Sequence, residues 1–177
     1  MQGNGKIIDH LNKVLSNELR AIHQYFLHSR MLSDWGLNRF AEAEYEESMD
    51  EMRHADKLIQ RILFLEGLPS MEYMGSVYIA KNAIDILHCD LKLENEAIPD
   101  LKSAIMACEK ENDFVSRDML LKILESEEEH ADHLSTQIAL GDKVGDENFL
   151  QHQIVHFQMQ FGCLQFHNFA YRSHRNK

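Results

Sequence analysis

Two Glu-x-x-His motifs hold the side chains of this sequence that are best suited to chemistry: Glu51 with His54, and Glu127 with His130. An α-helix turns by about 100° per residue, so two residues three positions apart lie on the same face. Each motif therefore presents one carboxylate and one imidazole to the same point. A single motif of this kind arises readily by chance in a chain rich in Glu and His, so the signal lies in its repetition.

The two motifs belong to a longer internal repeat with a fixed offset. Subtracting 51 from 127, or 54 from 130, gives 76 residues. The segment His-Ala-Asp-Lys-Leu at 54–58 returns as His-Ala-Asp-His-Leu at 130–134. Each half pairs one Glu on a first helix with a Glu-x-x-His on a second. The offset also relates Ile8, Asp9, Leu11, Leu15 and Glu18 to Ile84, Asp85, Leu87, Leu91 and Glu94.

The repeated polar residues share their helix faces with leucine and isoleucine, which predicts that they point into an apolar interior. Buried carboxylates are costly unless they are paired or bind a metal. A solvated surface explains any one of these residues, but not six in two copies at one offset. The candidate metal ligands are Glu18, Glu51, His54, Glu94, Glu127 and His130.

The donor set indicates which metal such a site would bind. Four carboxylates balance two divalent cations if both imidazoles are neutral. Carboxylate and imidazole ligands suit iron or manganese and tolerate zinc. Because the set contains no thiolate, it argues against a structural zinc site and against an iron–sulfur cluster.

Apolar stripes with steps of three and four residues predict an all-α fold whose long helices position these ligands. The stretch 68–81 is the longest irregular one, and it is long enough to cross the end of a bundle rather than form a tight hairpin. Gly36 is expected to end the first helix, and Gly141 and Gly145 to frame a break after the fourth. The predicted helices span about 6–34, 38–66, 82–111 and 114–140, followed by a short fifth helix that begins near Asp146.

Length, charge and cysteine usage narrow the functional classes. The 177 residues suit one domain, and a net charge of −11 argues against nucleic acid or an anionic membrane as a partner and favours attraction of cations. We find no segment that resembles a signal peptide or a membrane span. Three cysteines without a Cys-x-x-Cys motif fit a reducing, cytoplasmic location. Cys108 continues an apolar stripe, and we interpret it as a core residue.

Several longer segments extend the two motifs, and on these the chain resembles the bacterioferritins over roughly residues 1–155. The resemblance implies a ferritin-like four-helix bundle with a long crossover between helices 2 and 3 and a short fifth helix. The segments are NEL at 17–19, QYFLH at 24–28, DWGL at 34–37, DEMRHAD at 50–56, RILFLEGLP at 61–69 and VSRD at 115–118.

The resemblance implies iron storage and detoxification in a hollow shell of 24 subunits. In that family a di-iron ferroxidase centre within each subunit oxidises Fe(II), using O2 or H2O2, and ferric mineral is deposited in the shell. The six candidate ligands would form this centre. Glu51 and Glu127 would bridge the two irons, with Glu18 and His54 on one iron, and Glu94 and His130 on the other.

Further residues take roles from the same resemblance. Met52 corresponds to the ligand of a haem b shared between two subunits; from sequence alone, a methionine here is more often interface packing. Asp50 matches part of an inner-surface iron site, although Glu46 replaces the histidine often found beside it. Tyr25, seven residues after Glu18, is either an electron donor near the irons or a core tyrosine.

The end of the chain departs from the family. We expect a ferritin-like di-iron domain over 1–158 and an atypical C-terminal tail over 159–177, beyond the point where relatives soon stop. An adventitious tail is the favoured interpretation, and a targeting or cargo-docking segment the alternative. Because the fifth helix of the family packs near the four-fold pores, the tail also challenges assembly.

The expected partners are further copies of the chain, in a 24-mer built from dimers. A second bacterioferritin subunit type and a ferredoxin-like reductant are additional candidates. One competing hypothesis is a soluble di-iron oxygenase or peroxide-reducing enzyme that acts on an organic substrate. Another is a haem-binding or structural shell subunit without a working iron centre.

Overall fold

The computed structural model describes residues 3–73 and 75–154, and within them it contains five α-helices and no β-strand. The predicted all-α bundle with a short fifth helix is therefore confirmed. The predicted domain end at residue 158 and the tail over 159–177 lie outside the described residues. The helices are α1 (Gly5–Asp34), α2 (Asn38–Phe64), α3 (Ala83–Lys110), α4 (Phe114–Val144) and α5 (Asp146–Gln151).

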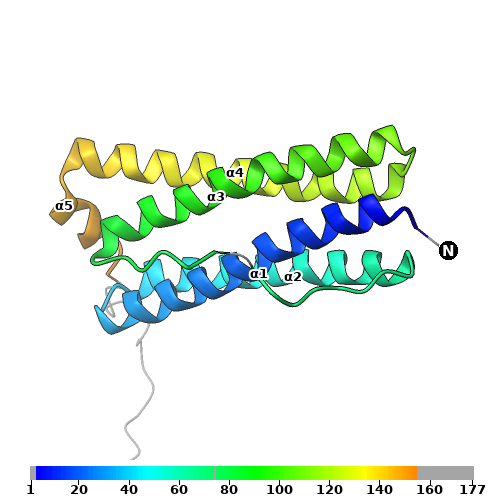
Figure 1. Ribbon diagram of the computed structural model, residues 1–177. Helices are drawn as coiled ribbons and strands as arrows, with labels where there is room; N and C mark the ends of the chain where they lie inside the picture. The colour runs from blue at the N-terminus through cyan, green and yellow to red at the C-terminus, as the bar shows by residue number, and fades with distance from the viewer. Residues whose placement is uncertain (1–2, 74, 155–177) are drawn as a thin grey trace, which may run out of the picture.

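The four long helices form two antiparallel pairs (Figure 1). α1 lies against α2, α3 lies against α4, and the pairs meet mainly through α1 and α3. The crossover segment, residues 65–82, runs the length of the bundle from the end of α2 to the start of α3, so the predicted long crossover is confirmed, although it runs along the bundle rather than across its end. Among the described helices, none combines the length and the apolarity needed to cross a membrane.

Side-chain caps start three of the long helices. The side-chain oxygens of Asn4, Asn82 and Asp113 accept hydrogen bonds from backbone N–H groups in the first turns of α1, α3 and α4. Such caps satisfy donors that a helix start otherwise leaves unpaired. Gly36, with φ of 81°, follows the end of α1, where a side chain would be strained, so the predicted stop is confirmed.

The predicted break at Gly141 is wrong. α4 continues through this residue to Val144, and the chain turns only at Gly145, where φ is 82°. Gly141 is buried, and a β-carbon added there would lie 4.0 Å from both Ile84 and Phe149. A β-carbon would make only ordinary van der Waals contact with these side chains, so Gly141 lies where Phe149 of α5 packs on α4 but the packing does not require a glycine.

Two apolar clusters fill the bundle, one on each side of a polar centre. The first includes Leu11, Leu58 and Leu120, and the second includes Leu32 and Phe149. Cys108 is fully buried in the first cluster, so its interpretation as a core residue is confirmed. Burial raises the pKa of its thiol to about 11.

A row of polar side chains on α1 holds the crossover segment by its peptide groups. These side chains are spaced by multiples of four residues and therefore follow one ridge, which runs obliquely around the helix. The contacts are Asn12 with Leu68 O (3.1 Å) and Ser70 N (2.8 Å), Arg20 with Ser76 O (2.9 Å), Gln24 with Tyr78 N (2.8 Å) and His28 with Tyr78 O (2.8 Å).

Asp113 both caps α4 and fastens it to α2. It accepts hydrogen bonds from Ser116 and pairs with Arg61 at 2.7 Å. Burial alone would raise the pKa of Asp113, but the Ser116 hydrogen bonds and Arg61 lower it below 3.8. A lowered pKa in the folded state stabilises the protein above the unfolded-state pKa, and this stabilisation is lost as the pH falls through the folded-state value.

We therefore predict that Asp113→Ala lowers the unfolding free energy of the metal-free protein by about 1–2 kcal/mol at pH 7. Urea titrations at several pH values should show this difference shrinking below about pH 4, as the wild-type carboxylate becomes protonated. Asp118→Ala, on the exposed side of the same turn, is the control and should change stability by less than about 0.5 kcal/mol. An undiminished difference at pH 2 would contradict the role of the Asp113 charge.

Candidate metal centre

The structure brings all six candidate ligands together at the centre of the bundle. We call these residues the six-residue cluster. Each long helix contributes, and all four carboxylates are at most 3 % exposed. The members are Glu18 from α1, Glu51 and His54 from α2, Glu94 from α3, and Glu127 and His130 from α4.

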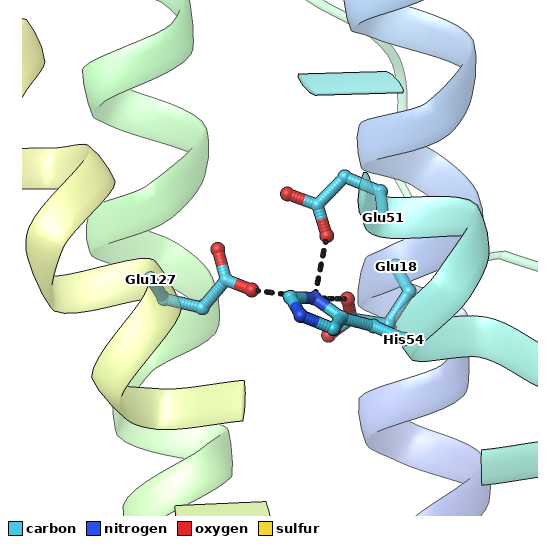
Figure 2. Close-up of side chains that lie close together, drawn as sticks. All are labelled: Glu18, Glu51, His54 and Glu127. Carbon is cyan, nitrogen blue, oxygen red and sulfur yellow. Dashed lines mark hydrogen bonds and ion pairs between the residues drawn. The ribbon is translucent and has the colours of Figure 1, made fainter. Parts of the chain in front are cut away.

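One half of the six-residue cluster surrounds the His54 ring (Figure 2). Its Nδ1 atom lies 3.3 Å from Glu18 Oε2, 3.4 Å from Glu51 Oε2 and 3.1 Å from Glu127 Oε1. A single ring nitrogen cannot donate one proton to three carboxylates. Three anionic oxygens that converge on one nitrogen instead resemble ligand atoms arranged around a cation.

The other half is built around His130. Its Nδ1 atom lies 3.3 Å from Glu94 Oε1, and the hydroxyl of Tyr25 donates to that same oxygen. Glu51 and Glu127 have ligand atoms within reach of both halves, so the six residues divide into two sets of four that share this pair. The sharing is the arrangement expected if two carboxylates lie between two metal ions.

Burial controls the protonation of the carboxylates. It raises the pKa of Glu18, and together with neighbouring carboxylates it raises that of Glu51 well above 4.5 and that of Glu127 to about 10. Glu94 behaves differently: burial opposes its ionisation, but the hydrogen bond to His130 outweighs this, so its pKa is lowered. In the absence of a metal, the carboxylates other than Glu94 therefore tend to retain protons.

The imidazoles respond to the same carboxylates in the opposite way. Burial disfavours the charged rings, yet hydrogen bonding to Glu127 and its neighbours raises the pKa of His54 to about 12. Contact with Glu94 likewise raises the pKa of His130 to about 9. Protons thus occupy the six-residue cluster where positive charge is needed, and metal ions can replace them.

Two further observations show that the donors fit metal ions. Glu18 Oε2 and Glu127 Oε1 are buried, and no donor is aligned with them as in a normal hydrogen bond: each is left with its ion-pair contact to His54 Nδ1, at 3.3 Å and 3.1 Å. A cavity of about 20 Å³ lies among the carboxylates of Glu18, Glu51, Glu94 and Glu127. This volume accommodates little more than a water-sized species. That the six residues bind iron remains a prediction.

The other predicted functional residues lie outside this cavity. Asp50 is about half exposed and pairs with Arg53, and Glu46 is exposed. Met52 is 48 % exposed on α2, next to Glu51 in sequence but on a different face. Their roles in inner-surface iron binding and haem binding stay predictions. Tyr25 is fully buried and contacts the six-residue cluster, in accordance with its expected position.

Sequence reasoning missed a second buried polar cluster. His28, Glu44 and Asp90 offer ligand atoms that lie within 4.8 Å of one another. Glu44 shares the inward stripe of the second predicted helix, but no motif assigns a role to the other two. Helical spacing from residues already predicted to point inward could have identified them: Asp90 precedes Glu94 by one helical turn, and His28 follows Tyr25 by three residues.

The raised pKa values predict how pH affects the metal-free protein. A group whose pKa is raised by folding stabilises the fold below its unfolded-state pKa, and this contribution is lost as the pH rises through the folded-state value. For Glu127 this window runs from 4.5 to about 10, and for His130 from 6.5 to about 9. The unfolding free energy should therefore fall between about pH 5 and pH 10.

Glu127→Gln should flatten this pH dependence by up to about 1.4 kcal/mol per pH unit, because it removes one titrating proton. Urea unfolding of metal-free protein across this range measures the slope. Glu125→Gln, an exposed change on the same helix, should leave the slope unaltered. Equal slopes for wild type and Glu127→Gln would show that Glu127 does not hold a proton in the folded state.

Comparison with known proteins agrees with this architecture. Residues 8–144 match the model of the ferritin family, described as a ferritin-like domain. A bacterioferritin from Brucella melitensis is 44 % identical over 151 residues, which cover 85 % of this chain and 94 % of that protein. Bacterial ferritins from Synechocystis and Pseudomonas aeruginosa are 44 % and 43 % identical; each alignment covers 87 % of this chain, and 99 % and 100 % of the respective relative. The chain therefore belongs to the bacterioferritin family.

Proposed function

We propose that this protein stores iron and detoxifies it by oxidising Fe(II) to Fe(III) at the six-residue cluster. The observation that carries the proposal is the pair of four-residue ligand sets that share Glu51 and Glu127. The relatives named bacterioferritin and bacterial ferritin support iron as the metal. O2 or H2O2 is the oxidant, and ferric mineral is the stored product.

Fe(II) is the substrate of this reaction, and the chain supplies charge and orientation. Two Fe(II) ions displace the protons that the six-residue cluster holds in the metal-free state, and four carboxylates then balance their charge. Two Fe(II) ions supply the two electrons that reduce O2 to H2O2, or H2O2 to water. Glu18 with His54, and Glu94 with His130, hold one ion each, while Glu51 and Glu127 fix the spacing between the ions.

Tyr25 holds Glu94 in place during this reaction. Its hydroxyl donates to Glu94 Oε1 and lies 3.4 Å from His130 Nδ1. Burial, followed by the charge of Glu94, raises the pKa of Tyr25 well above 10, so the hydroxyl keeps its proton. This contact also places Tyr25 where it can serve as the electron donor that the family resemblance implies.

The size of the central cavity favours iron oxidation over the competing enzyme hypothesis. The space of about 20 Å³ beside the four carboxylates suits a species as small as water or a metal ion, and this small volume favours metal ions over an organic substrate as its occupants. The same cavity and its paired ligand sets also favour a working centre over a shell subunit that lacks one.

The assembly that fits this function is a 24-mer of identical chains built from dimers. Apolar side chains recur on the outer face of α2, where Tyr45 and Met52 are 37 % and 48 % exposed. Arg30 of α1 lies over the Tyr45 and Phe26 rings at 5.2 Å, so this face extends across α1. A second bacterioferritin subunit type would be able to join through the same face.

Met52 is the residue through which two subunits would share one haem b. A thioether is an established axial ligand of haem iron, and the side chain is accessible on the face that another subunit would cover. When bound, the haem supplies a one-electron carrier between an external reductant, such as a ferredoxin-like protein, and the stored mineral. We place this system in the cytoplasm and assign the di-iron domain to 1–158.

The iron-oxidation proposal predicts a loss of activity in Glu94→Ala. Removing this carboxylate takes an anionic ligand from one set and leaves Tyr25 and His130 without their shared partner. Fe(II) oxidation, started with O2 or H2O2 and followed by Fe(III) absorbance, should slow by at least about 10–100-fold. Glu128→Gln, an exposed change on α4, is the control. An unchanged rate in Glu94→Ala would support a shell subunit without a working centre.

The haem proposal predicts a separable effect of Met52→Leu. This substitution retains an apolar side chain of similar volume but removes the sulfur ligand. Size-exclusion chromatography should still give a particle far larger than one chain, whereas the haem content should fall from about one per two subunits to near zero. The initial rate of Fe(II) oxidation should be retained. Full haem content in Met52→Leu would assign the methionine to interface packing.

A further inference from the structure

The second buried polar cluster, which we call the His28 cluster, consists of His28 on α1, Glu44 on α2 and Asp90 on α3. Its members are 0 %, 3 % and 0 % exposed. Asp90 lies one helical turn before Glu94, toward the end of the bundle that carries α5 (Figure 1). The His28 cluster is thus adjacent to the six-residue cluster but shares no member with it.

The peptide groups of Tyr78 fix where the protons lie. The Tyr78 N–H donates to Gln24 Oε1 at 2.8 Å, so the amide nitrogen of Gln24 faces Asp90 and donates to its Oδ1 at 2.8 Å. The Tyr78 carbonyl accepts from His28 Nε2 at 2.8 Å, and because a carbonyl can only accept, Nε2 carries a proton. In a neutral ring, the lone pair is then on Nδ1.

With the proton of a neutral His28 ring on Nε2, the Nδ1 lone pair faces a carboxylate oxygen, and neither atom can donate a hydrogen bond to the other. His28 Nδ1 lies 2.8 Å from Asp90 Oδ1, and two further oxygens, Glu44 Oε2 and Asp90 Oδ2, have no hydrogen-bond partner. The arrangement needs positive charge, from protons or from a bound cation. Adjacent ligand atoms on an ion bound at about 2.1 Å lie about 3 Å apart, close to the observed Nδ1–Oδ1 separation.

The ring orientation is also the one that metal-bound histidines adopt. A ligating imidazole usually donates its other N–H to a carbonyl or carboxylate, which fixes the tautomer and directs the lone pair at the metal. His28 does this through Nε2 and Tyr78 O. Gln24 in turn orients Asp90 from outside the cluster.

The internal repeat shows that the bundle does not require polar residues here. The 76-residue offset relates each member of the His28 cluster to a residue in the other half, and these counterparts are all apolar and fully buried in one core cluster. They are Ala104 for His28, Leu120 for Glu44 and Val14 for Asp90. The place in the bundle that the repeat relates to the His28 cluster is therefore packed with hydrocarbon.

An ion has a route to the His28 cluster. Glu44 also lines a cavity of about 440 Å³ beside α5, together with Glu47, His130 and His133. These carboxylate and imidazole side chains attract cations and can bind a passing ion one after another. A cation in this cavity reaches Glu44 without crossing the apolar core.

We propose that His28, Glu44 and Asp90 bind one divalent transition-metal ion per subunit, through His28 Nδ1 and the two carboxylates. Two carboxylates balance the charge of the ion when the imidazole is neutral. One nitrogen and several oxygen donors suit Fe(II), Mn(II) and Zn(II). This site is separate from the six-residue cluster and does not rest on the function proposed for it.

Zinc-soaked crystals of the full-length protein test the proposal. Anomalous difference maps recorded on both sides of the zinc absorption edge should show a peak among His28, Glu44 and Asp90, in addition to peaks at the six-residue cluster. In Asp90→Asn the first peak should disappear while the others remain. In Glu42→Gln, an exposed change two residues from Glu44, every peak should remain.

Each outcome separates this proposal from the proposed function. No peak at the His28 cluster, with zinc at the six-residue cluster, would show that protons alone hold it together and would overturn the inference. A persistent peak in Asp90→Asn would also overturn it. Zinc at the His28 cluster alone would support the inference while contradicting the proposed di-iron centre. Vacancy at both places would contradict both proposals.

A triple variant, in which each member of the His28 cluster is replaced by a residue like its counterpart in the repeat, provides a second measurement in solution. His28→Ala, Glu44→Leu and Asp90→Val together copy the apolar counterparts, and replacing buried charged groups by well-packed hydrocarbon is often neutral or stabilising. Zinc content after desalting should fall by one ion per subunit relative to wild type, with helical circular dichroism retained. Unchanged zinc content in this folded variant would refute the site.

Discussion

Charge balance inside an apolar bundle is the constraint on which this structure depends. Four buried carboxylates meet at the centre of the six-residue cluster, where water cannot screen them. Without a metal, the positive charge that these carboxylates need comes from bound protons. Most of the carboxylates and both imidazoles therefore have raised pKa values. The same unbalanced negative charge is the physical basis of the divalent-cation binding that we propose.

Two large apolar clusters, one on either side, hold the helices around this centre. The clusters pack all four long helices, so the ligands approach from four directions and cannot move apart independently. The internal repeat supplies nearly symmetric contributions: one Glu from each first helix, and one Glu-x-x-His from each second helix. Beyond the centre the symmetry ends, because His28, Glu44 and Asp90 lie at positions whose counterparts in the repeat are buried hydrocarbon side chains.

The helices and the six-residue cluster could be predicted because both are periodic. Steps of three and four residues identify the inward faces, and the repeat selects Glu18, Glu51 and their counterparts from many acidic residues. The His28 cluster has no such signature, since its members come from three helices and make no local motif. The prediction for Gly141 failed because a glycine inside a helix does not by itself end the helix: α4 continues to Val144, and the chain turns at Gly145, where φ is 82°.

The crossover segment shows how an irregular stretch can still be specified by sequence. The path of the crossover is determined by residues of α1. Their side chains form hydrogen bonds with the peptide groups of Leu68, Ser70, Ser76 and Tyr78. Peptide groups are common to all residue types, so most crossover side chains can diverge without loss of these bonds. The spacing along the chain cannot: one inserted residue would shift every later peptide out of register with its partner on α1. The length of this connection, more than its composition, therefore determines whether it fits against α1.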